Sequence, residues 1–178
     1  MTDFRRRSAA QLPGKLVLLA ALGLLLPAAA GAEEDSPVAA CAAVSALTPA
    51  AAAEASPAIR GTVQNVRNSN GLITAVLYSD DPDTFLKRGA RLDRIRVVAQ
   101  QGETELCLKA PAAGRYSVAL YHDENGNKEF DRDFLGIPVE GYGFSQNPGF
   151  RFRKPDIEET LFTTNGSITP LQIKILYL

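Results

Sequence analysis

The sequence predicts an all-β protein, an antiparallel Greek-key β-sandwich of about seven strands. Three observations support this fold class. Apolar and polar residues alternate along several short runs, most clearly at 115–122, as expected where one face of a strand is buried. Asn-Gly pairs at 70–71 and 165–166 separate such runs, and this dipeptide is a strong hairpin signal. Helical periodicity is almost absent beyond residue 57.

The first half of the domain is predicted to contain two strand pairs. Residues 59–66 and 72–78 form one pair around the first Asn-Gly turn, and residues 91–100 and 104–110 form the next pair around a Gln-Gly turn. A brief helix is expected between the pairs. Asp81 suits its N-cap, Pro82 its first position and Gly89 its end.

The second half contains the most regular alternation. A turn at 111–114 precedes the strand at 115–122, and segments 157–162 and 168–177 are expected to form a closing hairpin. Two groups of side chains should share a buried face within their strands: Tyr116, Val118 and Leu120, and then Leu171, Ile173, Ile175 and Tyr177. Short strands separated by frequent turn signals favour a sandwich.

The first 32 residues are predicted to be a secretory signal peptide that is cleaved after Ala32. Three arginines at 5–7 are followed by the apolar run 16–26, Pro27 and several small residues, which is the expected order. An uncleaved anchor is the alternative, but the apolar run is shorter than the ~20 residues that span a bilayer. We therefore expect a periplasmic or secreted protein without a membrane span after cleavage.

Residues 33–57 are rich in Ala and are interrupted by Pro, so we interpret them as a tail or linker before a domain at 58–178. The whole chain carries a formal charge of −1. The removed segment has four basic residues and one acidic residue, which gives +3, so the mature chain carries −4. This mild acidity argues against general nucleic-acid binding, which depends on Lys and Arg contacts to phosphates.

Cys41 and Cys107 are the only cysteines, and in an exported protein two cysteines most simply form one disulfide. Two unpaired thiols are the alternative. Residues 38–41 also resemble a lipobox, but three acidic residues separate them from the apolar run. Strand alternation places Cys107 opposite Leu106 and Leu108, on the solvent side, where it would hold the N-terminal tail.

The acidic loop, residues 123–131, carries the strongest functional signal. Side-chain oxygens recur at Asp123, Asn125 and Asn127, Glu129 offers a backbone carbonyl, and Asp131 adds a further carboxylate. This spacing matches the first part of an EF-hand loop and predicts a calcium site. The alternative is a polar turn in which Asx side chains satisfy the loop backbone without a metal.

Two positions of the acidic loop depart from the EF-hand pattern. The sixth position, where Gly provides a positive φ, is Lys128, and the twelfth, where a bidentate Glu is usual, is Phe134. Asp133, Glu140 or water are candidates for the missing ligands. With two amides in place of carboxylates we expect weak affinity, of order 10⁻⁴–10⁻³ M.

The segment 136–145 combines dense glycine with Tyr142 and Phe144. Glycines let a backbone run close to another surface, so these rings, with Glu140, are candidates for a surface that binds an envelope protein or a glycan. The alternative is that both rings fill the end of the sandwich, which is the commoner fate of aromatic side chains. Three basic residues at 151, 153 and 154 are interpreted as a solvated face.

Catalytic patterns are poor. His122 is the only histidine, so neither a His-rich zinc site nor a standard triad has enough members. We therefore favour a protein that binds or supports over an enzyme. The alternative is a periplasmic hydrolase that uses His122 with Asp123 or Glu140, although adjacent strand residues point to opposite faces.

The run 121–127, Asp131 and the run 134–145 together resemble domain-of-unknown-function family 2141, a family of exported bacterial proteins. The residues 111–116 and the closing strands are similar to that family as well, and the resemblance covers roughly 58–178. It implies an exported domain similar to transthyretin or carboxypeptidase-regulatory sandwiches and no established activity. The family pattern often has Gly where this chain has Lys128, which weakens a metal assignment by analogy.

Overall fold

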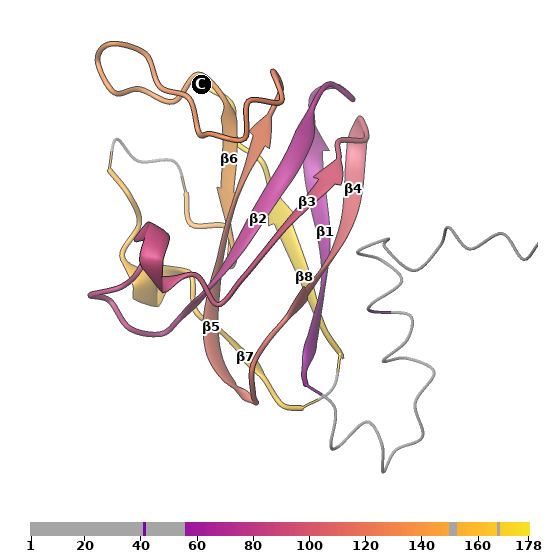
Figure 1. Cartoon of the computed structure of the whole chain (residues 1–178), viewed down its shortest axis with the longest axis vertical. Coiled ribbons are helices and arrows are strands. Elements are labelled where there is room, and N and C mark those ends of the chain that lie inside the picture. The colour runs from indigo at the N-terminus through magenta and orange to yellow at the C-terminus, as the bar shows by residue number, and fades with distance from the viewer. Residues whose placement is uncertain (1–40, 42–55, 150–152, 167) are drawn as a thin grey trace, which may run out of the picture. The chain divides into compact units, whose positions relative to one another are not determined.

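The computed structural model describes residues 41, 56–149, 153–166 and 168–178. These residues form an all-β domain with eight strands in two sheets and almost no helix (Figure 1). The signal peptide expected at 1–32 and most of the linker expected at 33–57 lie outside the described residues. Within the described part of the chain, no helix is long and apolar enough to cross a membrane.

The smaller sheet contains three strands in the order β4 (Gly102–Lys109), β1 (Ala58–Val66) and β8 (Ile168–Lys174). Strands β1 and β4 are antiparallel, whereas β1 and β8 are parallel. The expectation of a wholly antiparallel fold is therefore wrong for one pair. The reason is that β8 enters the sheet from the end where β1 begins, with Ala58 opposite Ile168.

The larger sheet contains β3 (Asp93–Val98), β2 (Leu72–Ser79), β5 (Gly114–Asp123) and β6 (Gly141–Phe144) in that order. A short strand, β7 (Phe162–Thr164), also pairs with β5. Strand β7 pairs with the first residues of β5. Strand β6 pairs with the last residues of β5. The end of β5 therefore lies between β2 and β6, and the acidic loop starts there.

One hydrophobic core joins the two sheets. Ile59 and Leu108 from the smaller sheet and Leu77 and Val118 from the larger sheet are fully buried in it. The faces predicted from alternation are confirmed, since these predicted residues belong to the core or pack against it: Tyr116, Val118, Leu120, Leu171, Ile173, Ile175 and Tyr177. Each fully buried apolar side chain contributes about 1.5–3 kcal/mol, so this shared core explains why the sheets pack face to face.

The closing hairpin expected around Asn165-Gly166 is wrong. Strand β7 pairs in the larger sheet and β8 in the smaller sheet, so the two strands are not partners. The first part of the expected strand 157–162 is instead a 3₁₀ turn, η2 (Ile157–Glu159). A reciprocal capping box between Asp156 and Glu159 stabilises that turn, and strand alternation does not reveal it.

The brief helix expected after Asp81 is only partly present. The carbonyl of Asp81 accepts hydrogen bonds from the N–H groups of Thr84 and Phe85, and its Oδ1 accepts one from Asp83 N–H. A separate 3₁₀ turn, η1 (Arg88–Ala90), follows. Gly89 lies inside η1 and does not end a helix, so that detail of the prediction is wrong.

The disulfide is confirmed: Cys41 and Cys107 are joined, with their Cα atoms 5.8 Å apart. Both cysteines are buried in a small cluster that includes Ala58 and lies apart from the main core. Cys107 is opposite Leu106 and Leu108, as alternation predicts, but it is buried in the cluster with Cys41 and Ala58. The expectation that Cys107 faces solvent is therefore wrong.

Candidate functional site

The acidic loop begins where β5 ends, and Asp123 is the buried residue at this junction. Its side chain is 0% exposed, and its Oδ2 accepts a hydrogen bond of 2.7 Å from Lys128 N–H. Lys128 has φ +67°, a left-handed conformation that favours glycine. The sixth loop position therefore has the backbone conformation of an EF-hand loop although its residue is not Gly.

The outer part of the loop converges on Asp131. The side-chain amides of Asn125 and Asn127 donate hydrogen bonds of 2.7 and 2.8 Å to its Oδ2. The Oδ1 atoms of the same two asparagines accept from the N–H groups of Asn127 and Glu129. Three of the predicted ligand residues thus lie together, with amide N–H groups next to Asp131 where a cation would otherwise neutralise the carboxylate.

Glu140 lies beneath this loop. It is 5% exposed, and its Oε2 accepts a hydrogen bond of 3.2 Å from Asp131 N–H. Burial raises the pKa of the Glu140 carboxyl, and the charges of Asp131 and Asp123 raise it further. Glu140 is therefore grouped with the loop carboxylates more than with the aromatic surface to which the sequence assigned it.

Among the described residues, Asp123 Oδ1 and Glu140 Oε1 are buried carboxylate oxygens that accept no hydrogen bond of standard geometry, although the Glu124 N–H also lies near the Glu140 carboxyl and lowers its pKa. Each carboxylate accepts one backbone hydrogen bond through its other oxygen, but buried carboxylates usually have a cation or several donors as partners. Carboxylate oxygens of this kind are the ligands that a hard cation prefers. Asp133, another candidate ligand, instead accepts the N–H groups of Leu135 and Ile137 through its Oδ1.

Among the described residues, no group of three or more His, Cys, Asp or Glu side chains is arranged to hold a metal ion. A cation at this loop would therefore need amide and backbone oxygens in addition to carboxylates. Asn125, Asn127 and the Glu129 carbonyl are the oxygens that the sequence offers for this purpose. The amide groups of both asparagines would have to turn, because their nitrogens now face Asp131.

His122 is a buried structural residue. Its side chain is 0% exposed, Nδ1 lies 2.8 Å from the Tyr177 hydroxyl, and Nε2 lies 2.8 Å from the Asn70 carbonyl oxygen. A carbonyl can only accept, so Nε2 carries the proton and Nδ1 accepts from Tyr177. The nearest carboxylate oxygen, on Glu124, is 3.8 Å away. This geometry gives no support to a hydrolase based on His122.

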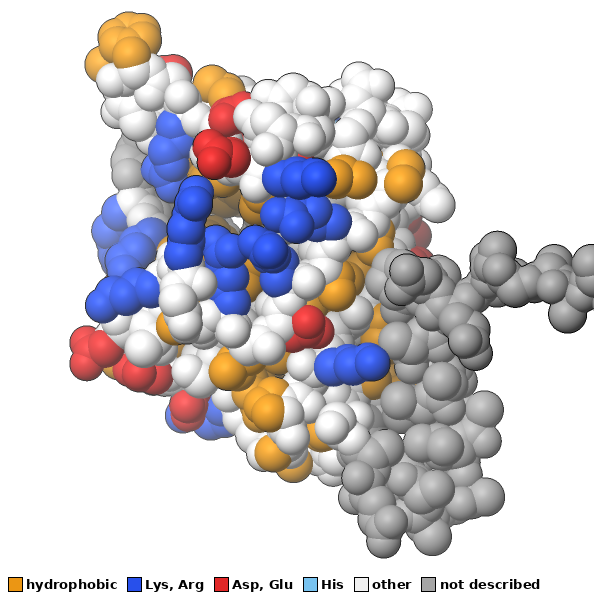
Figure 2. Space-filling model, viewed as in Figure 1, with side chains coloured by type: hydrophobic (Ala, Val, Ile, Leu, Met, Phe, Trp, Pro, Cys, Tyr) orange, Lys and Arg blue, Asp and Glu red, His pale blue; other side chains and the backbone are white. Residues whose placement is uncertain are grey.

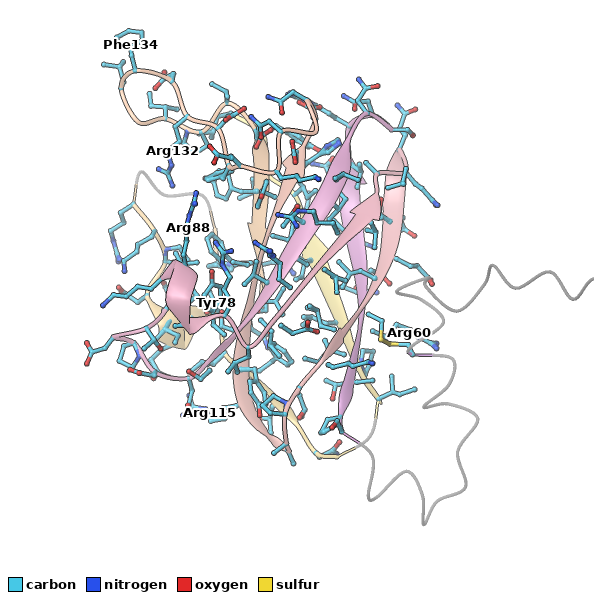
Figure 3. The ribbon with its side chains drawn as sticks, in the orientation of Figure 1. Arg60, Tyr78, Arg88, Arg115, Arg132 and Phe134 are labelled. Carbon is cyan, nitrogen blue, oxygen red and sulfur yellow. A yellow bond between two sulfur atoms is a disulfide. The ribbon has the colours of Figure 1, made fainter. Side chains whose placement is uncertain are left out.

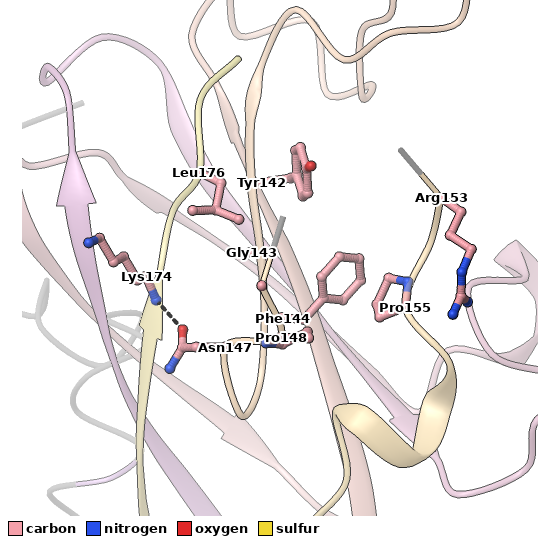
Figure 4. A pocket seen from close by; sticks show the side chains of 10 residues that line it. Tyr142, Gly143, Phe144, Asn147, Pro148, Arg153, Pro155, Lys174 and Leu176 are labelled. Carbon is pink, nitrogen blue, oxygen red and sulfur yellow. Dashed lines mark hydrogen bonds between the residues drawn. The ribbon is translucent and has the colours of Figure 1, made fainter. Parts of the chain in front are cut away.

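Tyr142 and Phe144 project from the outer face of β6, and both are half-buried. The hollow next to them holds about 110 Å³ and is bordered by Pro148, Pro155 and Leu176 (Figure 4). Pockets for organic ligands usually hold about 300–1,000 Å³, so this hollow is too small for one. The two rings contact each other edge to face, with centroids 6.1 Å apart.

A larger concave surface, the basic groove, lies on the outer face of the larger sheet and encloses about 780 Å³. Tyr78, Tyr121, Tyr142 and Phe144 contribute aromatic rings to its lining. Among the described residues that line it, Glu129 is the single acidic side chain, whereas seven side chains are cationic: Arg88, Arg91, Arg94, Lys128, Arg132, Arg153 and Lys154. Figure 2 shows blue side chains gathered around a hollow on this face.

The basic groove is not visible in the sequence, because its arginines come from segments far apart in the chain. Arg88 lies in η1, Arg94 in β3 and Arg132 after the acidic loop. One signal was present: Arg94 and Arg96 alternate with Ile95 and Val97, and the latter two pack in or against the core. Two basic residues from the small patch at 151–154, Arg153 and Lys154, also line the groove.

A family profile described as an uncharacterized protein conserved in bacteria matches residues 62–172 of this chain. The match includes both sheets, the acidic loop and the segment with Tyr142 and Phe144. Comparison with curated proteins gave no match, and comparison with solved structures gave none either. Because the profile spans more than half of the chain, this protein belongs to the DUF2141 family of bacteria.

Proposed function

We propose that this chain is an exported, non-catalytic β-sandwich of Greek-key type whose acidic loop binds calcium in the periplasm or outside the cell. Asp123, Asn125, Asn127 and Asp131 supply side-chain oxygens, and Glu129 supplies its backbone carbonyl. The chain then has a calcium-stiffened rim next to the surface formed by Tyr142 and Phe144, which is the candidate contact for an envelope protein or glycan.

The two buried carboxylate oxygens that accept no hydrogen bond of standard geometry carry this proposal. A loop that is only a polar turn has no need to bury Asp123 completely or to place Glu140 beneath Asp131. The mutual repulsion of these carboxylates is relieved by a divalent cation between them. Glu140 is thus the best-placed residue for the ligand that an EF-hand loop takes from its twelfth position.

Thermal unfolding of the disulfide-bonded protein tests the site. Calcium at about ten times its dissociation constant stabilises the folded state by about 1.4 kcal/mol, which raises the melting temperature by about 3–6 °C for a domain of this size. Asp123→Asn should abolish that rise. Glu129→Gln is the matched control and should keep it, because only the backbone oxygen of Glu129 is a proposed ligand.

The decisive comparison is between excess calcium and excess chelator. A melting temperature that is the same in both, at calcium concentrations of about 5–10 mM, would falsify the calcium site, because that range exceeds the expected dissociation constant. A calcium response that persists in Asp123→Asn but disappears in Glu129→Gln would place the ion elsewhere.

A further inference from the structure

Residues 132–139, which we call the finger, project beyond the end of the sandwich (Figure 1). The finger has a defined shape because its own backbone is hydrogen-bonded. Asp133 N–H donates to the Ile137 carbonyl at 2.8 Å, and Asp133 Oδ1 accepts from the N–H groups of Leu135 and Ile137. Arg132 also donates to the Gly136 carbonyl. These hydrogen bonds hold the finger in one conformation in which its tip is exposed.

The side chains at the tip of the finger are apolar and face solvent. Phe134 is 94% exposed and Leu135 is 69% exposed, while Ile137 and Val139 are 42% and 54% exposed. None of the four belongs to a hydrophobic cluster of the described residues. Contiguous exposed apolar side chains of this kind mark an interaction surface. Figure 3 shows Phe134 at the extremity of the loop.

The basic groove opens directly below the finger, since Leu135, Ile137 and Pro138 line one side of it. The side chain of Arg132, from the finger, and that of Arg88, from η1, point toward each other at the same opening (Figure 3). Among the described residues, no ion pair joins Arg88 or Arg132 to a carboxylate. Like charges held on facing sides of a groove favour an anion between them.

We propose that the finger and the basic groove form a docking surface for a membrane with anionic lipid headgroups. Phe134 and Leu135 enter the interfacial region of the bilayer, and the groove arginines pair with lipid phosphates. Apolar side chains beside a cationic surface are the combination that binds proteins to anionic membranes. Guanidinium groups suit phosphate oxygens because they donate two parallel hydrogen bonds.

The choice of a membrane follows from the two features together. A soluble phosphate or acidic sugar would explain the arginines of the groove but not the exposed tip of the finger. An apolar protein partner would explain the tip but not the excess of cations around the groove. Lys128 and Glu129 of the acidic loop line part of the groove. The proposal does not depend on calcium, because Phe134, Arg88 and Arg132, which the variants below change, lie outside that loop.

Vesicle sedimentation tests the proposal with the purified protein. Vesicles that contain phosphatidylglycerol should bind the protein, and vesicles of pure phosphatidylcholine should bind it at least about tenfold more weakly. The variant Arg88→Gln/Arg132→Gln should lose about tenfold or more in affinity. Its charge-matched control is Arg60→Gln/Arg115→Gln, since these two arginines lie away from the finger (Figure 3), and it should retain binding.

The apolar contribution is tested by Phe134→Ser/Leu135→Ser, which should reduce binding strongly. The matched control is Leu92→Ser/Val98→Ser, because Leu92 and Val98 are also exposed but lie outside the finger. A further readout is available because the chain contains no tryptophan. The single tryptophan of Phe134→Trp should shift its emission to shorter wavelength when it enters anionic vesicles.

Each assay is run with calcium and with chelator. A failure of the membrane proposal can then be distinguished from a failure of the calcium site. Binding to anionic vesicles in either buffer, with loss in the finger and groove variants, supports the proposal. Absence of binding in both buffers overturns it, as does binding that the finger and groove variants leave unchanged. Binding of soluble glycerol phosphate without binding of vesicles also overturns it and assigns the groove to a soluble anion.

Discussion

Asp123 and Lys128 are linked across the acidic loop, since Asp123 Oδ2 accepts a hydrogen bond of 2.7 Å from Lys128 N–H. This bond fixes Lys128 at φ +67°, a conformation that costs a residue with a Cβ about 1–2 kcal/mol. Lys128 therefore adopts a backbone conformation whose cost only glycine would avoid.

We expect Lys128→Gly to stabilise the protein by about 0.5 kcal/mol, because relief of the left-handed conformation slightly exceeds the added chain entropy of glycine. Lys128→Ala removes the same charge but keeps the Cβ, so it should give no gain. Urea unfolding of both variants in chelator measures the difference. Equal stabilities for the Gly and Ala variants would show that the backbone at this position carries no cost.

Glu140→Gln should raise the stability of the calcium-free protein and weaken its stabilisation by calcium. In chelator, the neutral amide removes a buried charge that Asp131 and Asp123 repel, so stability at neutral pH should rise by about 1 kcal/mol. The calcium-dependent rise in melting temperature should shrink, because a carboxylate ligand has been lost. A variant that is less stable in chelator yet responds fully to calcium would contradict both parts.

The parts of this fold that could be predicted from the sequence are those that depend on neighbouring residues. Alternation located the strands β1 to β5 and the inward faces of β5 and β8, and composition predicted the disulfide. The pairing of β8 with β1 could not be predicted, because it depends on which sheet the chain enters after β7. Strand β6 was missed because Gly141 and Gly143 occupy its inner face and remove the apolar alternation.

The features of the candidate site that are local in sequence could also be predicted, whereas those that depend on the tertiary fold could not. The loop residues are adjacent in sequence, so their spacing was visible, and the turn at Asp133 is also local. The burial of Asp123 and the position of Glu140 beneath Asp131 depend on the packing of β5 beside β6. The basic groove depends on segments that are brought together only by the tertiary fold, and its arginines therefore looked like ordinary surface charges.

Removal of the disulfide should be strongly destabilising. The cysteines are 66 residues apart, and a cross-link over a loop of this length contributes about 4 kcal/mol. The double variant Cys41→Ala/Cys107→Ala should unfold at a lower urea concentration than the oxidised protein. A reducing agent should lower the midpoint of the natural chain and leave that of the variant unchanged. Two titratable thiols in the unreduced protein would contradict the pairing.

Gly141→Ala should be destabilising because β6 lies very close to the end of the chain. A Cβ at Gly141 would overlap the ring of Tyr177 and the side chain of Ile175. Overpacking of this kind costs about 1–3 kcal/mol. Gly89→Ala is the matched control, since a Cβ there meets nothing within 4 Å, and its effect should stay within about 0.5 kcal/mol. Chemical unfolding of both variants measures the contrast.

Arg67 and Glu124 form a bidentate pair at the base of the acidic loop. Arg67 Nε donates to Glu124 Oε1 at 2.7 Å, Nη2 contacts Oε2, and the Arg67 guanidinium lies 4.5 Å from the Tyr177 ring centroid. These hydrogen bonds hold the pKa of Glu124 below its ordinary value of 4.5, although burial partly opposes them. The pair is partly exposed, so solvent screening limits its contribution to about 0.5–1 kcal/mol.

This pair should make stability depend on pH in a definite direction. Because the pKa of Glu124 is lowered by folding, its contribution is fully present above the unfolded value of 4.5 and is lost as the pH falls through the folded value. Arg67→Gln should therefore be less stable than the natural chain at about pH 7, and this deficit should be smaller at about pH 3, when both are measured by urea unfolding in chelator. Arg115→Gln, which breaks a more exposed pair with Glu158, should change little at either pH. If Arg67→Gln loses the same stability at both pH values, Arg67 acts through its contact with Tyr177 and not through its charge.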